Sequence, residues 1–308
     1  MPMDAVFLHG LTQELTQSLI GTRIDKVQQP ERDLLLLSVR TQSGNAKLLV
    51  HGGVGSARVH FTAGTFENPA EPPMFCMLLR KHLVGARITG ISQPDFERML
   101  VLDLDGRDEL GTPVKKQLIV EMLGRQSNVI LVSADGHIID CMRRVDSSMS
   151  ETRQVQPGLF YRLPLRQDKP VLFDTTPEQR AQLLSGPVAA ATLDKWLLGL
   201  FSGVSPLLCR EVCFRALGDA SPGSSGWTMR SARAWSTSWT RWCSRSRRTI
   251  SRPPCCSTAT GRRIFPPCRS CSIRARWNAA AAAHFPSCWT NFISAATRRR
   301  PCAAARRS

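Results

Sequence analysis

Four residues late in the chain have a spacing typical of zinc ligands. They are Cys268, Cys271, His284 and Cys288. In the pattern C-x2-C-x12-H-x3-C, thiolates and imidazoles can bind the metal. Pro286, however, interrupts the helix that would have to present the last two ligands. Seven cysteines in residues 224–308 also make one C-x-x-C arise by chance about as often as not, so we predict no metal site and no cofactor.

Residues 1–223 lack the other common signatures of catalysis. They contain no phosphate loop, dinucleotide fingerprint or nucleophile elbow. The glycine run at 52–55 follows a strand-like segment but lacks the Lys and Ser/Thr of a phosphate loop, which indicates a turn. Five histidines are scattered without ligand-like spacing: His9, His51, His60, His82 and His137. We therefore predict that the chain is not an enzyme.

Basic side chains remain as candidates for binding, because lysine and arginine contact the phosphates of nucleic acids. The candidates are Arg80, Lys81, Lys115, Lys116, Arg125, Arg143 and Arg144. Arg125, in the turn Gly-Arg-Gln-Ser-Asn, is preferred, and a solvated surface is the alternative for each. Glu97 and Arg98 form a separate pair, in which the acid can hold the guanidinium toward a phosphate or base edge. The alternative for this pair is a surface contact at a strand edge.

The net charge of +17 points to a polyanionic partner, but its distribution changes that interpretation. Residues 224–308 hold 17 of the 41 basic residues, all of them arginine, and none of the 24 acids. Residues 1–223 are therefore neutral overall. The terminal segment also holds six of the seven tryptophans and shows no sustained apolar period. We interpret it as a disordered, Arg-rich tail translated from a wrong reading frame, which could still bind nucleic acid non-specifically.

Cysteine usage and the N-terminus indicate a cytosolic protein. The four cysteines of residues 1–223 lie in apolar surroundings, which suits reduced thiols. The N-terminus shows no basic stretch followed by an apolar run, and no apolar segment is long enough to span a bilayer. We therefore expect a cytoplasmic location and no membrane contact.

The elements that would position these side chains form an α+β fold. Asp4 can cap a helix over Ala5–Ile20, and a second helix is predicted at Met74–Leu83. Short runs between turn residues predict antiparallel strands and hairpins. These runs are Thr22–Gln29, Leu34–Arg40, Lys47–His51, Ala57–Thr62, Arg87–Gln93, Met99–Asp105, Gln117–Met122, Asn128–Ser133 and His137–Met142. The prediction is a mostly antiparallel β domain with two helices over residues 1–172.

Residues 173–223 are predicted to be helical, and residues 224–308 are predicted to form the tail. Thr176 begins a capping box with proline at the first helical position. A leucine-rich stripe ends near Gly203, and Ser205-Pro206 begins another helix. This helical pair predicts a helix-turn-helix-like arrangement, the start of a helix-hairpin-helix-like unit. Such pairs often bind nucleic-acid backbones, and a plain packed hairpin is the alternative.

Several runs are similar to the NFACT-N domain of the RqcH and NEMF ribosome-quality-control family, the fibronectin-binding protein A type. They are GLTQEL at 10–15, RIDKVQQP at 23–30, ENPAEPPMFCMLLRKHL at 67–83, FERM at 96–99, EMLGRQSNVIL at 121–131 and VSPLLCREV at 204–212. The third run is long and idiosyncratic, which makes the resemblance specific. The similarity runs in register to about residue 220, and the chain then departs from the family, as a truncation or frameshift after about residue 223 would cause.

The resemblance implies a function in translation. Family members bind the large ribosomal subunit that still carries peptidyl-tRNA, recruit charged tRNA(Ala) and support untemplated C-terminal tailing of the stalled chain. Peptide-bond chemistry belongs to the ribosome, and the factor supplies positioning. In the family an N-terminal acid and an Asp-Arg pair are attributed to tRNA recognition, which here implies Asp4, Glu97 and Arg98. Glu97 stands where aspartate is the better-known residue, and a helix cap is the alternative role of Asp4.

Three other interpretations stay open. The NFACT-N domain is similar to the N-terminal domain of formamidopyrimidine-DNA glycosylases, whose nucleophile is an exposed N-terminal proline followed by glutamate. Pro2 is present here but Met3 replaces the glutamate, which disfavours lyase activity. A surface adhesin with fibronectin as its partner is the second, although no export signal or disulfide framework supports it. A non-functional, truncated fragment is the third.

Overall fold

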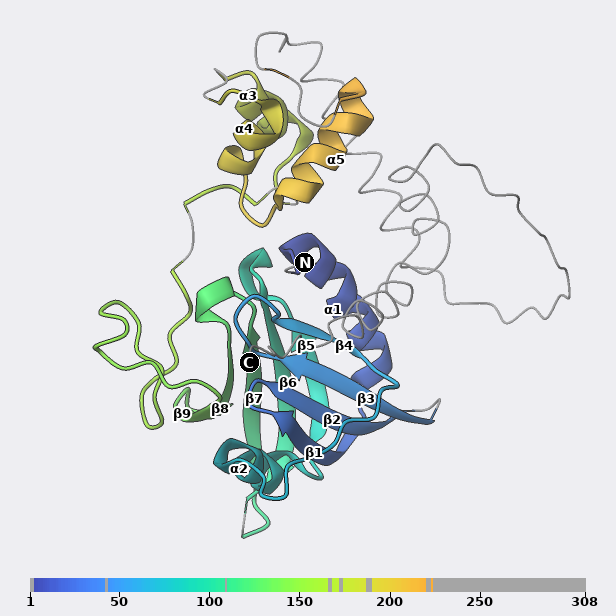
Figure 1. Cartoon of the computed structure of the whole chain (residues 1–308), viewed down its shortest axis with the longest axis vertical. Coiled ribbons are helices and arrows are strands. Elements are labelled where there is room, and N and C mark those ends of the chain that lie inside the picture. The colour runs from blue at the N-terminus through green and yellow to red at the C-terminus, as the bar shows by residue number, and fades with distance from the viewer. Residues whose placement is uncertain are drawn as a thin grey trace, which may run out of the picture.

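The computed structural model describes residues 3–41, 44–108, 110–165, 168–171, 174–186, 190–219 and 223. Within them a β-rich domain comes first and a helical unit follows it (Figure 1). The predicted tail at 224–308, with the zinc-like pattern that begins at Cys268, lies outside the described residues, as does Pro2. The boundaries 1–172, 173–223 and 224–308 therefore stay predictions.

Helix α1 (Ala5–Leu19) forms where the apolar stripe and its cap were expected. The Asp4 carboxylate accepts a hydrogen bond from the Phe7 backbone N–H at 2.8 Å, which satisfies one of the free amides of the first turn. The buried apolar residues of the helix are Ala5, Leu8, Leu11, Leu15 and Leu19. Gly21 follows with a φ of 82°, a left-handed conformation that glycine adopts without strain, and the chain turns there into the first strand.

Nine strands form one sheet in the order β4-β3-β2-β1-β5-β6-β7-β8-β9. They are β1 (Arg23–Glu31), β2 (Leu34–Thr41), β3 (Gly44–His51), β4 (Arg58–Phe61), β5 (Arg87–Ser92), β6 (Met99–Arg107), β7 (Pro113–Glu121), β8 (Asn128–Ser133) and β9 (Ile138–Cys141). All neighbouring pairs are antiparallel. The predicted α+β class, with a large antiparallel sheet and few helices, is confirmed for the described residues.

The sheet consists of two halves that meet at a narrow junction. β1 and β5 pair in register at Arg23 and Arg87. In Figure 1, β2 and β3 run across the direction of β6 and β7. A single core contains buried residues from both halves, for example Leu37 and Leu48 from one and Leu118 from the other. Burial of this apolar area is the main driving force for folding of the domain.

Helix α2 (Met74–Leu83) has the predicted bounds and closes one side of that core. Its buried residues are Phe75, Cys76, Leu79 and Leu83. Three basic residues, Arg80, Lys81 and His82, occupy the last turn, where positive charge interacts favourably with the negative end of the helix dipole.

Three helices form the helical unit: α3 (Pro177–Leu184), α4 (Leu193–Leu200) and α5 (Pro206–Leu217). The predicted pair corresponds to α4 and α5, and α3 precedes it at the predicted capping box, which is present at Thr176. The unit has its own small core. Its buried residues are Leu184, Leu193, Trp196, Leu197, Phe201, Leu208, Cys209, Val212 and Cys213.

The described residues contain neither a membrane span nor a metal cluster. No helix among them combines the length and the apolar character that crossing a bilayer requires. No group of three His, Cys, Asp or Glu side chains in these residues is arranged to hold a metal ion. Four cysteines, Cys76, Cys141, Cys209 and Cys213, are free and buried. Burial raises the pKa of the Cys209 and Cys213 thiols to about 12, which makes both poor nucleophiles.

Candidate nucleic-acid interface

Arginines that are far apart in the sequence lie at the same end of strands β6 to β9. The register pairs Met99 with Glu121, and the Met122 N–H donates to the carbonyl of Arg98 at 2.9 Å. Glu121 in turn pairs with Asn128 across β7 and β8, so the turn between them lies at the same end. The 3-10 helix η2 (Gly124–Gln126) in that turn carries Arg125.

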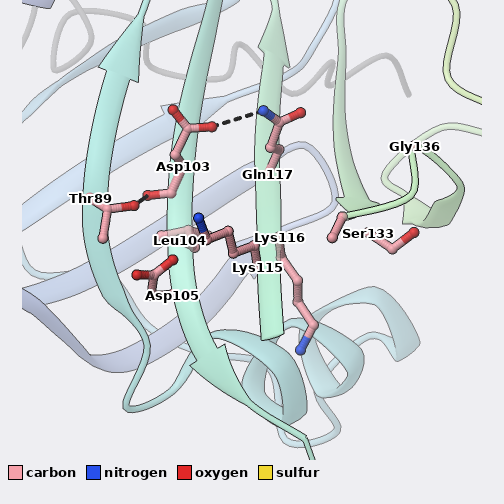
Figure 2. Close-up of a pocket in the computed structure, with 10 residues that line it drawn as sticks. Thr89, Asp103, Leu104, Asp105, Lys115, Lys116, Gln117, Ser133 and Gly136 are labelled. Atoms are coloured by element: carbon pink, nitrogen blue, oxygen red, sulfur yellow. Dashed lines mark hydrogen bonds between the residues drawn. The ribbon is translucent and has the colours of Figure 1, made fainter. Parts of the chain in front are cut away.

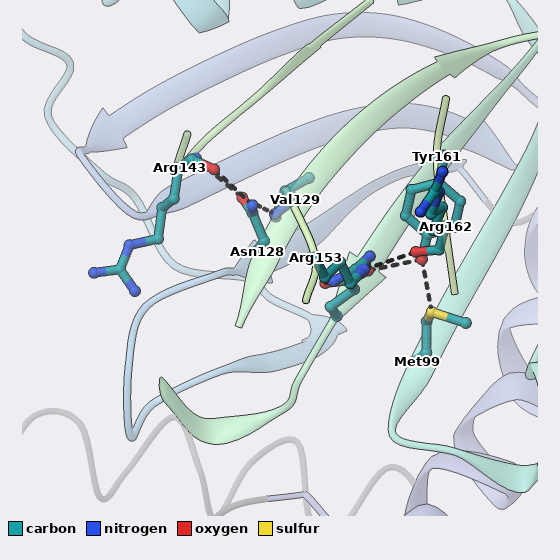
Figure 3. Close-up of polar contacts among 8 residues, drawn as sticks. Met99, Asn128, Val129, Arg143, Arg153, Tyr161 and Arg162 are labelled. Atoms are coloured by element: carbon teal, nitrogen blue, oxygen red, sulfur yellow. Dashed lines mark hydrogen bonds and ion pairs between the residues drawn. The ribbon is translucent and has the colours of Figure 1, made fainter. Parts of the chain in front are cut away.

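Asn128 fixes the next arginine to this end of the sheet. Its side-chain amide donates to the carbonyl of Arg143 at 2.7 Å, and its carbonyl oxygen accepts from the Arg143 N–H at 3.0 Å. Figure 3 shows the Arg143 side chain extending away from Asn128. We call Arg98, Arg125, Arg143 and Arg144 the arginine edge.

The guanidinium groups of the arginine edge are available to a ligand. Arg125 is exposed, and Arg98 and Arg143 are half-buried. None of these three side chains makes a hydrogen bond or ion pair to another of the residues that the structure describes. Arg144 lies 3.6 Å from an Asp140 oxygen, but its side chain is 69% exposed, and a surface pair of this kind contributes little. Such an edge can bind phosphate groups.

The predicted contact between Glu97 and Arg98 does not form. Both side chains are half-buried, and the structure records no ion pair between them. The reason is local backbone geometry. The 3-10 helix η1 (Pro94–Phe96) precedes the pair, and Arg98 is then held by its backbone bond to Met122 at the start of β6.

Asp4 lies at the N-termini of two helices. One carboxylate oxygen caps α1 through Phe7, and the other accepts a hydrogen bond from the Ser205 hydroxyl at 2.6 Å. Ser205 itself caps α5, because its hydroxyl oxygen accepts from the Leu208 N–H at 3.2 Å. The helix-cap alternative is therefore realised, and the carboxylate additionally joins the β domain to the helical unit.

Arg80 and Lys81 do not belong to the arginine edge. Both lie on α2, and Figure 1 places α2 at the end of the β domain away from α5. The Arg80 Nε–H donates to the carbonyl of Val27 at 3.0 Å, so this half-buried side chain ties α2 to β1. Lys81 is exposed on the helix surface. The fold thus separates these two from the other candidates.

A groove of about 430 Å³ lies on the outer face of β5 to β8 (Figure 2). It contains Lys115 and Lys116, the remaining basic candidates, together with Asp103 and Asp105. Asp105 pairs with Lys115 across the two strands, and Asp103 accepts a hydrogen bond from Gln117 at 2.8 Å. Lys116 instead pairs with Leu104, and its side chain is buried on the opposite face of the sheet. One ammonium group beside two carboxylates suits a polyanion less well than the arginine edge does.

Sequence reasoning missed a buried polar network next to the arginine edge (Figure 3). The Glu121 side chain is 0% exposed, and both of its oxygens accept hydrogen bonds from the Arg153 guanidinium. The only tyrosine of the chain, Tyr161, donates to Glu121 at 2.7 Å. An acid after the apolar run Leu118-Ile119-Val120 is a sign that a partner is needed, but nothing in the sequence identifies Arg153.

The burial of this network and the charge of Glu121 shift the pKa values of Tyr161 and Arg153. Burial and the Glu121 carboxylate raise the pKa of Tyr161, so the phenol stays protonated and donates. Burial alone would lower the pKa of Arg153, but its hydrogen bonds to Glu121 raise it above the ordinary value. The network fastens the segment around Arg153 and Tyr161 to the sheet beside Met99, whose sulfur lies 3.2 Å from the Tyr161 hydroxyl oxygen.

Comparison with known proteins identifies the family. The family model for the NFACT N-terminal and middle domains matches residues 4–272, a range that continues past residue 223. The Rqc2 homolog RqcH of Bacillus subtilis is 40% identical over 217 residues, which are 70% of this chain and 38% of that protein. The ribosome quality control complex subunit NEMF of Mus musculus is 28% identical over 140 residues, 46% of this chain and 12% of that protein. This chain therefore spans well under half the length of these curated relatives.

Solved structures of N-terminal domains of this kind also match the fold of this chain. The crystal structure of the N-terminal domain of fibronectin-binding protein PavA from Streptococcus pneumoniae superposes with a TM-score of 0.63 at 31% identity. The match covers 68% of this chain and 82% of that one. From its sequence and its fold, the chain belongs to the NFACT family.

Proposed function

We propose that this chain is the N-terminal, RNA-binding part of a ribosome quality control factor. The observation that carries the proposal is the arginine edge, where Arg98, Arg125 and Arg143 present guanidinium groups without partners among the described residues. Such a set of like charges does not stabilise the folded domain, but it attracts a polyanionic ligand. The names of the relatives in Bacillus subtilis and Mus musculus supply the process.

In the finer form of the proposal, the ligand is tRNA on the large ribosomal subunit. The chain binds a subunit that still carries peptidyl-tRNA and helps recruit charged tRNA(Ala) for untemplated C-terminal tailing. Arg98, Arg125 and Arg143 contact RNA phosphates or base edges, with Arg144 and Glu97 beside them. The chain positions RNA in the cytoplasm and performs no chemistry of its own, because the ribosome forms the peptide bond.

The experiment compares the chain with a variant in which Arg98, Arg125 and Arg143 are all replaced by alanine. We expect weaker binding of labelled tRNA and less cofractionation with free large subunits. The slope of log affinity against log salt should fall by about one for each arginine that contacts a phosphate. The control replaces Arg23, Arg32 and Arg40, three exposed arginines on the other half of the sheet, of which Arg40 forms only a surface pair with Asp25. Equal losses in both triple variants would show that the binding is only a net-charge effect and would refute the arginine edge.

Fibronectin binding is the second candidate, favoured by the name of the solved structure from Streptococcus pneumoniae. It predicts saturable binding to immobilised fibronectin at physiological salt. Loss of that binding in the Arg98, Arg125 and Arg143 variant would assign fibronectin to the same surface. The likeness of the sheet domain to glycosylase N-terminal domains and the helix-turn-helix character of α4 and α5 stay predictions, and an abasic-site cleavage assay tests the first.

Whether this chain can perform the proposed function by itself depends on the nature of residues 224–308. The matched family range reaches residue 272, whereas the alignment with the Bacillus subtilis relative spans 217 residues. We propose a shift of reading frame in this segment, and translating the other two frames of the gene tests it. A competing frame rich in acids and lysines would support the shift, and its absence would oppose it.

A further inference from the structure

The loop that carries Glu97 and Arg98 has an unusual backbone. Asp95 and Phe96 have φ values of 49° and 55°, in the left-handed region that residues other than glycine rarely adopt. Two such residues in succession are strained, so surrounding contacts must maintain the conformation. Arg98 follows two residues later, and its direction therefore depends on whatever holds the loop.

Contacts from α1 hold one side of the loop. The Gln93 side-chain amide donates to the carbonyl of Ala5 and to the carbonyl of Glu97, both at 2.9 Å. The rings of Phe96 and His9 lie with their centroids 5.5 Å apart. These contacts fasten the loop to the first turns of α1.

The link between α4 and α5 holds the other side. Gly203 lies so close to Phe96 that a Cβ atom at this position would be 2.6 Å from a ring carbon. Gly203 also has a φ of 72°, which disfavours any larger residue. Two residues on, Ser205 donates its hydroxyl hydrogen bond to Asp4. Val6 of α1 packs against the core of the helical unit, which completes the joint.

We propose that Gly203 and Ser205 are positioning residues for Arg98. The link at residues 201–205 covers Phe96 and keeps the Gln93–Arg98 loop in its left-handed conformation. Docking of the helical unit through Asp4 and Ser205 thereby sets the direction of Arg98 on the arginine edge. Binding of RNA by Arg98 then depends on the position of the helical unit, a coupling that rests on the proposed RNA-binding function.

The first test measures the joint without RNA. Backbone amide exchange in a peptide covering residues 93–98 should rise in Ser205→Ala, because the loop loses its cover. Thr176→Ala is the matched control, since Thr176 caps α3 within the same unit and its cap bonds are to Gln179. Ser205→Thr keeps a hydroxyl and should restore slow exchange. Unchanged exchange of residues 93–98 in Ser205→Ala would overturn the proposal, and so would an equal increase in Thr176→Ala.

The second test is a double-mutant cycle with labelled tRNA as the probe. We expect Ser205→Ala to weaken binding by about three- to tenfold, within the usual range of coupling between sites. The same substitution in an Arg98→Ala background should have no further effect, because Ser205 acts through Arg98. Additive losses would overturn the proposal. If the unmodified chain binds no tRNA, the proposed function fails, while the exchange experiment still decides the coupling.

Discussion

The molecule contains two sets of arginines that lie near the same end of strands β6 to β9 and have opposite roles. Arg153 is buried and paired with Glu121, and its side chain is only 13% exposed. Arg98, Arg125 and Arg143 have no such partner among the described residues. A paired and buried guanidinium contributes to folding only while its partner is present. An unpaired one at the surface can contribute to a ligand instead.

Removing Arg153 should have the largest effect. Arg153→Ala leaves the buried Glu121 carboxylate without its cation, so we expect a loss of about 3–5 kcal/mol in the free energy of unfolding. Denaturant titration followed by tryptophan fluorescence measures it. Arg144→Ala is the control, because its exposed pair with Asp140 should change stability by less than about 0.5 kcal/mol. Similar values for the two variants would remove the distinction between the two sets.

Arg98→Ala should leave folding intact and reduce binding. The side chain makes no bond to another described residue, so the unfolding midpoint should stay unchanged. Affinity for tRNA should fall by about tenfold, the usual size for one specific guanidinium contact. Alanine tailing in a reconstituted assay should fall with it. A fully active Arg98→Ala chain would exclude Arg98 from RNA recognition.

Asp4 should show a smaller effect that depends on the substituent. Asp4→Ala removes the α1 cap and the acceptor for Ser205, with an expected cost of about 1–2 kcal/mol. Asp4→Asn keeps an oxygen for the cap, so it should recover part of that loss. Thermal unfolding of both variants gives the difference. Because the proposed joint runs through Asp4 and Ser205, we expect Asp4→Asn to weaken tRNA binding no more than Ser205→Ala does, and a larger loss at full stability would show that the carboxylate contacts RNA directly.

The smallest effect concerns pH. Burial and, less strongly, the charge of Arg58 lower the pKa of His51 from 6.5 to about 4, against the opposing effect of Asp33. Its Nδ1 accepts from the Gly53 N–H at 3.0 Å, and the Ser56 hydroxyl also faces the ring. Between these two pKa values the unfolded chain binds a proton that the folded chain does not, so stability falls as pH drops through that window. His51→Gln should flatten the pH dependence of unfolding, and an unchanged slope would contradict this account.

Local sequence signals predicted most of the elements. The bounds of α2 and β8 are those expected, and α1 ends one residue earlier than predicted. β7 begins at Pro113 rather than Gln117, because Lys115 and Lys116 pair with β6 and extend the strand beyond its apolar part. Period-two alternation detects only the part of a strand that faces a core, so paired polar ends are missed.

The candidate site could be predicted only in part. The resemblance implied Arg98, and Arg125 was preferred among the basic candidates, but nothing in the sequence separated Arg143 from Arg80 and Lys81. The strand register separates them, because it brings residues 98, 122, 128 and 143 to one end. Register depends on long-range pairing that no short window of sequence contains.

The sequence by itself determined the element types, the cap at Asp4, the uneven distribution of charge and the resemblance to a family. These follow from residues within a few positions of one another, through side-chain periodicity and local hydrogen bonds. Only the tertiary structure decided that Asp4 contacts Ser205, that Arg153 pairs with Glu121 and that the Arg98 side chain has no partner among the described residues. Each of these depends on which groups are desolvated together, and that is a property of the packed chain rather than of any segment.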